Sequence, residues 1–494
     1  METDVLIAGA GPVGLMLALE LARYGLHVRL IDPDDAPTEQ SRALVVWPRT
    51  LEHLARHPGL DERFLSNGLR VTEAHFFHGG KPLASTKLDT VDTPYPFALM
   101  VPQSETERLL TERLAELGVQ VERRTSFTSF RENGSSVTST LQHADGAAEE
   151  LTTRWLVGAD GAHSAVRHAL GVGFTGEQLP SDWVLADVHL DGDVLPDAVE
   201  LHLHPEGVLA IFPLPPNRFR VIAAYLHGEH EPTLEEMQRI LDQRRGPGVR
   251  AHDPVWLSQF HISERIVENF RRGNVFLAGD AAHIHSPAGG QGMNTGMQDA
   301  VNLAWKIALI SGGHLSKAGE ETLLASYNEE RHPVAQDVLT GAGLLTRAAM
   351  VDNSLLSHVR NAAIRTAFGL DLTRHSFAEA ATELAVSYPH SRLNGRDDKL
   401  KGGPRVGQRA PVHAGDAPVS TGPAPLFTLF ATKGPDSSQL IDCYPQFFAP
   451  EPRPPFVEGG IWIVRPDGYV AFAGDSDSWA AADAYLAKLV YHQG

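Results

Sequence analysis

Two glycine-rich segments, far apart in the sequence, contain residue types that can hold a phosphate or another electron-rich group. The first is Gly9-Ala10-Gly11-Pro12-Val13-Gly14, a G-x-G-x-x-G pattern. The second runs from Gly279-Asp280 through Gly289-Gly290-Gln291-Gly292-Met293-Asn294. Glycine lets the backbone approach a ligand closely, and the N-terminus of a helix attracts negative charge. Two such loops in one chain predict one long ligand that is held at both ends.

The first loop has the context of a dinucleotide-binding turn. The apolar run 4–8 predicts a buried strand before it, and the spacing of apolar residues in 15–22 predicts a helix after it. Residues 27–31 predict the next strand, which ends at Asp32. A glycine-rich turn without a ligand is the alternative. It is disfavoured because the strand, the helix and the acid are all present.

Each residue of this turn has a specific expected role. Gly9 permits the tight turn, Gly11 the approach of a pyrophosphate, and Gly14 the close packing of helix on strand. Asp32 is expected to bind an adenosine ribose. The pattern alone does not distinguish FAD from NAD.

A second G-x-G-x-x-G match, at 171–176, lacks this context. A predicted helix at 164–170 precedes it, and Pro180 blocks a helix after it. Gly171 is better explained as the glycine that ends a helix. The sequence therefore predicts no separate Rossmann site for NAD(P)H.

Further landmarks lie between the two loops. A predicted strand at 151–157 ends in Gly158-Ala159-Asp160-Gly161, where Asp160 could cap the next helix or contact a cofactor; by itself the cap is favoured. Ser104 and Glu107 fit a capping box at the start of another helix. Arg42, after the strand that ends at Asp32, could reach a pyrophosphate.

Composition limits the class of protein. A chain of 494 residues is expected to form two or three domains. Its net charge of -19 argues against nucleic acid and anionic membranes as partners. The single cysteine, Cys443, cannot form an internal disulfide, and no apolar run approaches the length of a membrane span. We expect a cytoplasmic protein without a signal peptide, as a monomer or homodimer.

Taken in order, these segments resemble the single-component FAD-dependent aromatic hydroxylases, the para-hydroxybenzoate hydroxylase class (group A flavin monooxygenases). The shared pieces are the Gly9 fingerprint, Ser41-Arg42, the Gln103 helix, 158–161, and the loop from Gly279-Asp280 to Asn294. The details look most like the polyketide-tailoring hydroxylases of antibiotic biosynthesis and the rifampicin and phenol hydroxylases. These relatives share the Pro287 to Asn294 loop and the helix containing 299–303.

The resemblance implies a role for each matching residue. Asp280 would bind the ribityl chain of FAD, and Pro287 would line the flavin edge beside the substrate. Backbone groups from Gly290 to Asn294, including those of Gly292 and Met293, would approach the flavin N1/O2 edge. The remaining cofactor-binding residues implied or predicted are Gly9, Gly11, Pro12, Val13, Gly14, Asp32, Arg42, Gln103, Asp160 and Gly161. One difference from many relatives is Asp32-Pro33, where a glutamate and a basic residue are usual.

The resemblance also implies the chemistry. The protein would bind FAD, use NADPH or NADH transiently, and hydroxylate a phenolic or polyketide-type aromatic substrate with O₂ through a flavin C4a-hydroperoxide. No metal and no catalytic side chain are expected. Candidate bases for a phenol are His75, His78, His202 and His204, which cannot be ranked. Trp47, Phe76 and Phe212 could bind the substrate or simply pack in the core.

The expected fold class is α/β. It combines a Rossmann-like FAD-binding domain with an inserted substrate-domain sheet and a thioredoxin-like C-terminal domain. The FAD-binding domain is expected at 1–73, 98–178 and 270–345, and the substrate domain at 74–97 and 179–269. A helical connector (346–394) and the C-terminal domain (395–494) follow. Two alternatives remain open: a Baeyer–Villiger or epoxidising monooxygenase on the same scaffold, and a non-catalytic protein that binds FAD and an aromatic compound.

Overall fold

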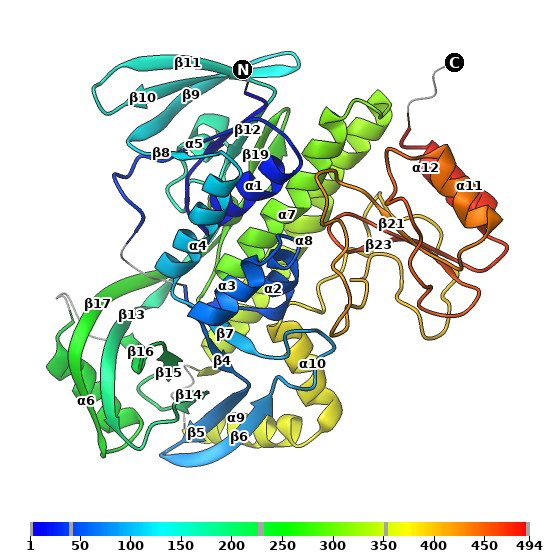
Figure 1. Cartoon of the computed structure of the whole chain (residues 1–494). Coiled ribbons are helices and arrows are strands. Elements are labelled where there is room, and N and C mark those ends of the chain that lie inside the picture. The colour runs from blue at the N-terminus through cyan, green and yellow to red at the C-terminus, as the bar shows by residue number, and fades with distance from the viewer. Residues whose placement is uncertain (1–2, 39–42, 226–231, 350–353, 491–494) are drawn as a thin grey trace.

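The structure is a computed structural model that describes residues 3–38, 43–225, 232–349 and 354–490 (Figure 1). A six-stranded sheet lies at the centre of its N-terminal part. In spatial order its strands are β18 (Arg271–Arg272), β19 (Val275–Leu277), β12 (Trp155–Gly158), β1 (Val5–Ala8), β2 (Val28–Ile31) and β8 (Val121–Glu122). Neighbouring strands are parallel except for β18 and β19. The apolar runs of β1, β12 and β19 are buried, as parallel strands covered on both faces require.

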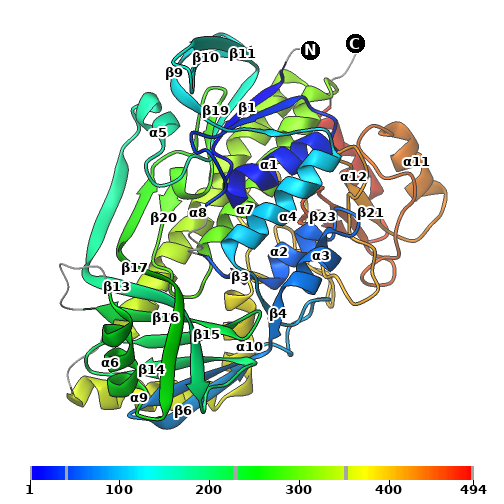
Figure 2. The ribbon, with the colours of Figure 1, turned by 60° about the vertical axis from the view of Figure 1, so that its left-hand side comes forward.

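Three helices that bear on the site pack together beside this sheet. Helix α1 (Pro12–Arg23) follows β1 and contacts both α4 (Gln103–Glu116) and α7 (Gly292–Ser311) (Figures 1 and 2). The 3₁₀ turn η1 (Gly279–Ala281) follows β19 and contacts α7. The predicted strand–turn–helix–strand unit at the N-terminus is confirmed, because β1, α1 and β2 occur where the sequence places them.

Smaller elements surround this core. One sheet contains β3 (Val45–Val46), β7 (Ala98–Met100) and β4 (Leu69–Val71), beside helices α2 (Pro48–Leu54) and α3 (Leu60–Asn67). Another contains β9 (Thr125–Asn133), β10 (Ser136–His143) and β11 (Ala148–Thr153). The strand predicted at 151–157 is divided between β11 and β12, which belong to different sheets.

The second G-x-G-x-x-G match has the structure expected of a helix end. Helix α5 (Ala165–Leu170) precedes it, and Gly171 has the left-handed φ of 66° typical of the residue after a helix. Strand β13 begins at Phe174, so no helix follows the glycines. The prediction that this segment is not a dinucleotide-binding turn is confirmed.

An eight-stranded sheet combines three segments that are separate in sequence. Its strands, in order, are β20 (His283–Ile284), β17 (Val249–Val267), β13 (Phe174–Gly192), β16 (Arg218–Tyr225), β15 (Leu209–Leu214), β14 (Ala198–Leu203), β5 (Glu73–His78) and β6 (Lys81–Lys87). Only β14 and β5 pair in parallel. Helices α6 (Leu234–Arg244), α9 (Ser354–Phe368) and α10 (Asp371–Ala381) pack against this sheet (Figures 1 and 2).

The C-terminal part is a smaller lobe beside α7 and the 33-residue helix α8 (Lys317–Ala349) (Figure 1). Strands β21 (Thr428–Phe430), β22 (Ile461–Val464) and β23 (Val470–Gly474) form an antiparallel sheet, with helices α11 (Pro435–Cys443) and α12 (Trp479–Ala487). No helix in the described ranges is long and apolar enough to cross a membrane.

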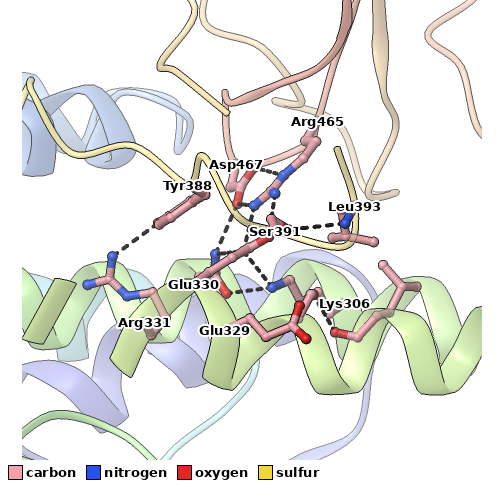
Figure 3. A network of polar contacts seen from close by, with 12 residues as sticks. Lys306, Glu329, Glu330, Arg331, Tyr388, Ser391, Leu393, Arg465 and Asp467 are labelled. Carbon is pink, nitrogen blue, oxygen red and sulfur yellow. Dashed lines mark hydrogen bonds and ion pairs between the residues drawn. The ribbon is translucent and has the colours of Figure 1, made fainter. Parts of the chain in front are cut away.

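A buried polar network joins this lobe to α7 and α8 (Figure 3). The Glu330 carboxylate accepts hydrogen bonds from Arg465 at 2.6 and 2.9 Å, from Lys306 Nζ at 2.8 Å and from Asn302 at 2.7 Å. Arg465 also pairs with Asp467. Burial alone would favour the neutral acid, but Arg465 and Lys306 hold the pKa of Glu330 well below its usual range. The lobe is therefore docked through charges that have no access to water.

Candidate cofactor-binding site

The first glycine-rich loop has the geometry of a phosphate cradle. Gly9 has φ 100°, and a Cβ on it would lie 2.4 Å from the carbonyl oxygen of Ala159. A Cβ on Gly14 would lie 1.9 Å from the carbonyl oxygen of Gly9. In contrast, a Cβ on Gly11 would meet no protein atom within 4 Å. Gly9 and Gly14 therefore allow the turn to close, while the space above Gly11 at the start of α1 is available to a ligand.

No side chain caps this end of α1. The backbone N–H groups of its first turn have no partner within the helix, and the helix dipole adds partial positive charge there. The residues present thus fit the pyrophosphate of a dinucleotide.

Asp32 lies at the end of β2 beside this turn. Its Oδ2 accepts a hydrogen bond from the Ala10 N–H at 2.7 Å, and its Oδ1 accepts one from the Asp34 N–H at 3.0 Å. Arg123 pairs with Oδ1 at 3.2 Å. These contacts fix the position of the carboxylate relative to the fingerprint, and its role toward a ribose stays a prediction.

The second loop packs directly on the first. Cβ atoms on Gly279 and Gly296 would lie 2.7 and 2.6 Å from Cγ2 of Val13, so glycine is needed where the two segments meet. The Asp299 carboxylate of α7 accepts a hydrogen bond from the Gly279 N–H at 3.0 Å. The start of α1 and the Gly279-Asp280 turn are therefore held together, although about 270 residues separate them.

Asp299 is itself held by two buried partners. Its carboxylate contacts His283 Nε2 at 2.8 Å and accepts a hydrogen bond from Arg331 Nε at 2.6 Å. Burial opposes ionisation, but Arg331 and His283 outweigh this effect and lower the pKa of Asp299. A charged Asp299 thus holds the Gly279-Asp280 turn in place through the Gly279 N–H.

Asn294 connects the loop to β3. Its Oδ1 accepts a hydrogen bond from the Trp47 N–H at 2.9 Å, and its Nδ2 donates to the carbonyl oxygen of Val45 at 2.8 Å. The Trp47 indole N–H donates to the carbonyl oxygens of Gly289 and Gly290, each at 3.2 Å. Both side chains therefore have a structural task in holding the loop.

A pocket of about 360 Å³ lies where the two loops meet the eight-stranded sheet. It gathers many of the predicted residues: Gly11, Pro12, Val13, Gln103, Gly161, Phe212, Asp280, Pro287, Gly290, Gly292 and Met293. A larger cavity of about 740 Å³ lies between α2 and the C-terminal loops, and it contains none of the predicted site residues. The smaller pocket is the candidate site, because it alone includes both glycine-rich loops.

Other predicted residues do not line this pocket. They include Gly9, Gly14, Asp32 and Asn294, whose contacts are given above. Arg42 is outside the described residues. Asp160 accepts hydrogen bonds from Ser164 Oγ and from the Val166 N–H of α5. The N-cap of α5 is Ser164, whose side chain accepts from the Arg167 N–H, so Asp160 supports the cap and does not occupy its position. Burial raises the pKa of Asp160.

The predicted aromatic and histidine candidates are also divided. Phe212 lines the pocket, whereas Phe76 packs on Phe368 with ring centroids 5.1 Å apart. None of the candidate bases His75, His78, His202 and His204 lies among the pocket residues. Instead, His75 pairs with Glu73, His202 with Glu200, and His78 contacts the carbonyl oxygen of Leu203.

The capping box predicted at Ser104 and Glu107 is wrong. Helix α4 starts at Gln103, after Pro102, and no side chain caps it. Gln103 Nε2 donates to Glu107 at 2.9 Å, while its Oε1 accepts from the Ala43 N–H at 3.1 Å. Gln103 thus orients the segment that follows the undescribed residues 39–42.

Two titratable residues of the pocket, Arg220 and His285, had not been assigned a role from the sequence. Arg220 on β16 is fully buried and forms two 2.8 Å hydrogen bonds with Asp187 on the neighbouring β13. His285 contacts the Ser286 carbonyl oxygen through Nδ1, and burial lowers its pKa to about 4. The pocket therefore contains a paired cation and a neutral imidazole. For Arg220, the signal available in the sequence was an arginine at a strand position that faces inward.

Comparison with known proteins identifies the family of this chain and several relatives. The model of the family described as "FAD binding domain" matches residues 2–342. The chain is 37% identical to a 6-methylpretetramide 4-monooxygenase from Streptomyces rimosus, over 91% of this chain and 76% of that protein. It is 40% identical to a rifampicin monooxygenase from Streptomyces venezuelae, over 68% of this chain and 69% of that protein. The solved structure of the anhydrotetracycline hydroxylase OxyS from Streptomyces rimosus has a TM-score of 0.81 and 30% identity, covering 99% of both chains.

Proposed function

We propose that this chain, which belongs to the FAD binding domain family, hydroxylates an aromatic substrate. Its relatives include monooxygenases named for an aromatic compound, for 6-methylpretetramide and for rifampicin. The proposed reaction uses FAD as the bound cofactor, NAD(P)H as the electron donor and O₂ as the oxygen donor. The proposed substrate class is phenolic or polyketide-type. The observation that carries this proposal is the pocket at which α1, the Gly279–Asn294 loop and the eight-stranded sheet meet.

The residues of the pocket suggest how FAD would be held. We assign the pyrophosphate to the open space above Gly11, the adenosine ribose to Asp32 and the ribityl chain to Asp280. The flavin ring would lie at the start of α7, near Gly290, Gly292 and Met293. When bound, FAD supplies the electron transfer and oxygen activation. The chain's own task is to bind, orient and exclude water.

The sheet side of the pocket is assigned to the substrate. Phe212 and Ile222 offer apolar surface there, and Pro287 and Met293 close the loop side. Arg220 brings a positive charge to the same wall while Asp187 balances it. An apolar pocket with few, fixed polar groups suits an aromatic ligand with oxygen substituents.

We also propose the domain division 1–73, 98–178 and 270–345 for FAD, 74–97 and 179–269 for substrate, 346–394 as connector, and 395–494 as a thioredoxin-like domain. Supporting the last assignment, Phe427 and Phe430 form parallel bridges with Phe448 and Arg453 across α11, and β22 and β23 add antiparallel to that unit. The exposed Cys443 has no cysteine partner, so a packing role suits this domain better than a redox role.

Product analysis tests the activity. The protein is incubated with FAD, NADPH or NADH, and a panel of phenolic polyketides and simple phenols under isotopically labelled dioxygen. We expect a hydroxylated product that carries one labelled oxygen atom and forms only when the nicotinamide is present. Binding of the aromatic compounds without any oxygenated product would contradict the proposal.

Asp280→Ala is expected to weaken FAD binding by about tenfold or more, because a charged acceptor for the ribityl hydroxyls is lost. The Asp280→Asn variant keeps an acceptor without the charge and should lose less. The FAD dissociation constant, measured from the fluorescence of released flavin, checks both. Full flavin affinity in the alanine variant would refute the role assigned to Asp280.

A further inference from the structure

The end of helix α10 contains a residue whose backbone and side chain are both unusual. Glu383 has φ 61°, in the left-handed region that favours glycine. The Glu383 N–H donates to the Ala380 carbonyl oxygen, and the Leu384 N–H donates to that of Glu379. This is the Schellman pattern, in which the left-handed position is usually occupied by glycine. A glutamate here carries backbone strain that glycine would not.

Glu383 also differs from the other residues with this backbone conformation. The described non-glycine residues with positive φ are Arg124, Asn217, Asp253, Glu383, Lys399 and Ser420. Only Glu383 among them is buried, with 2% of its surface exposed. Strain retained at a buried residue with a carboxyl side chain suggests that the side chain has a task that glycine cannot perform.

The side chain reaches the pocket end of α7. Its Oε1 accepts a hydrogen bond from Thr295 Oγ1 at 2.8 Å, and its Oε2 accepts one from Gln298 Nε2. These two residues lie in the first two turns of α7, on the segment that starts with Gly292 and Met293 of the pocket. Glu383 therefore holds this end of α7 from outside the pocket.

Two backbone contacts of the same segment strengthen this connection. Gln291 Nε2, just before α7, donates to the Ala380 carbonyl oxygen at 2.9 Å. The Arg49 N–H of α2 donates to the Thr382 carbonyl oxygen at 3.4 Å. The end of α10 thus contacts the loop, the start of α7 and α2 at once. The helix lies against the eight-stranded sheet (Figures 1 and 2).

The electrostatic surroundings favour an uncharged carboxyl group. Burial is the main cause that raises the pKa of Glu383 to about 8, and Asp299 on α7 acts in the same direction. Arg331 on α8 and the hydrogen bonds from Thr295 and Gln298 oppose the shift without cancelling it. The Arg49 guanidinium of α2 is engaged by Glu52. At neutral pH the side chain thus adds no negative charge to the end of α7.

We propose that Glu383 is a positioning residue for the FAD site, which holds the start of α7 and the Pro287–Asn294 loop in their ligand-binding arrangement through its buried carboxyl group. The proposal rests on the proposed function, because the ligand it serves is FAD. It explains why a strained glutamate occupies a position where glycine would relieve the backbone. It also links the helical connector (346–394), which contains α10, to the pocket.

Two substitutions separate the side chain from the backbone. Glu383→Gly relieves the strain and removes the carboxyl group. Glu383→Gln keeps an uncharged acceptor for Thr295, and its NH2 group donates to Gln298 once the Gln298 amide turns to present its oxygen. We expect the glycine variant of the holoenzyme to bind FAD about tenfold more weakly, and the glutamine variant to bind it as wild type does at pH 7. Lys399→Gly is the matched control, because Lys399 has φ 57° but is exposed and outside the pocket. It should leave FAD affinity unchanged.

The pH profile provides a readout that survives if the glycine variant folds poorly. Since the folded-state pKa of Glu383 is raised above the usual 4.5, the stability that its bound proton contributes is full below pH 4.5 and is lost as pH rises through about 8. Wild-type FAD affinity should therefore fall as Glu383 ionises around pH 8, because a negative charge then opposes the positive end of α7. Glu383→Gln should not show this fall.

Three results would overturn the inference. They are wild-type FAD affinity in Glu383→Gly, an equal loss of affinity in Glu383→Gln, and identical pH profiles for wild type and the glutamine variant. Each of these can occur in a protein that binds FAD, so they count against Glu383 alone. A wild-type protein that binds no FAD would reject both this inference and the proposed function.

Discussion

Gly11→Ala abolishes stable retention of FAD while the protein keeps its fold, with an expected loss of affinity of about 100-fold, or about 2.7 kcal/mol. The added methyl group meets no protein atom within 4 Å, so the apoprotein tolerates it. Gly11 has φ -75° and ψ -177°, which alanine adopts readily. The methyl group instead occupies the space through which a pyrophosphate must approach the N-terminus of α1. FAD content after purification and the dissociation constant of added FAD measure the effect.

The rejected second match provides the control. Gly173 is the central glycine of the G-x-G-x-x-G pattern at 171–176, and a Cβ on it likewise meets no atom within 4 Å. Gly173→Ala should therefore leave both fold and FAD affinity unchanged. If the two variants bind FAD equally well, the pyrophosphate does not lie at α1.

Glu330→Ala is the substitution with the largest expected effect on stability, a loss of about 3–5 kcal/mol in the free energy of unfolding. It leaves Arg465 and Lys306 buried without their shared carboxylate, and it removes an acceptor for Asn302 and Ser391 (Figure 3). Most of this cost comes from the buried Lys306 ammonium, which loses its ion-pair partner, and from Arg465, which keeps only Asp467. Urea denaturation followed by tryptophan fluorescence measures it.

The adjacent residue is a matched control. Glu329 pairs with Arg392 at the surface, where its side chain is about one-third exposed. Glu329→Ala should cost at most about 1 kcal/mol, since exposed ion pairs contribute little. A similar loss in both variants would mean that burial of the network does not determine its contribution. Because α7 carries Asn302 and Lys306, Glu330→Ala should also weaken FAD binding, whereas Glu329→Ala should not.

The parts of the fold predicted well from the sequence are those specified by local pattern. The unit from β1 through α1 to Asp32 depends on apolar spacing and on glycines within one short segment. The same holds for the helix that ends at Gly171. The capping box at Ser104 failed because α4 begins at Gln103 with Pro102 as its N-cap. Ser104 therefore lies two positions past the place that a capping serine must occupy.

The site was predicted only in part, because much of it depends on contacts between distant segments. Asn294 was expected near a flavin, yet its side chain bonds to Trp47 and Val45, 247 and 249 residues away. Neither partner could be identified from spacing. None of the four candidate histidines lines the pocket, and two of them, His75 and His202, pair with nearby carboxylates. The pocket instead contains His285, which follows β20, and Arg220, which lies on β16.

Glu383 illustrates a further limit. Its importance depends on a positive φ and on the burial of its carboxyl group against Thr295, and neither is visible in a sequence. The sequence at 381–384 predicts an ordinary helix end. Only the packing of α10 on the start of α7 distinguishes it.

The absorption spectrum of the purified protein tests the central claim most directly. It is recorded under nitrogen with a phenolic polyketide present, before and after addition of NADPH or NADH. We predict the visible bands of bound oxidised FAD at first, and their loss once the nicotinamide is added. A colourless protein that releases no FAD on denaturation, or a bound flavin that neither nicotinamide reduces, would contradict the account.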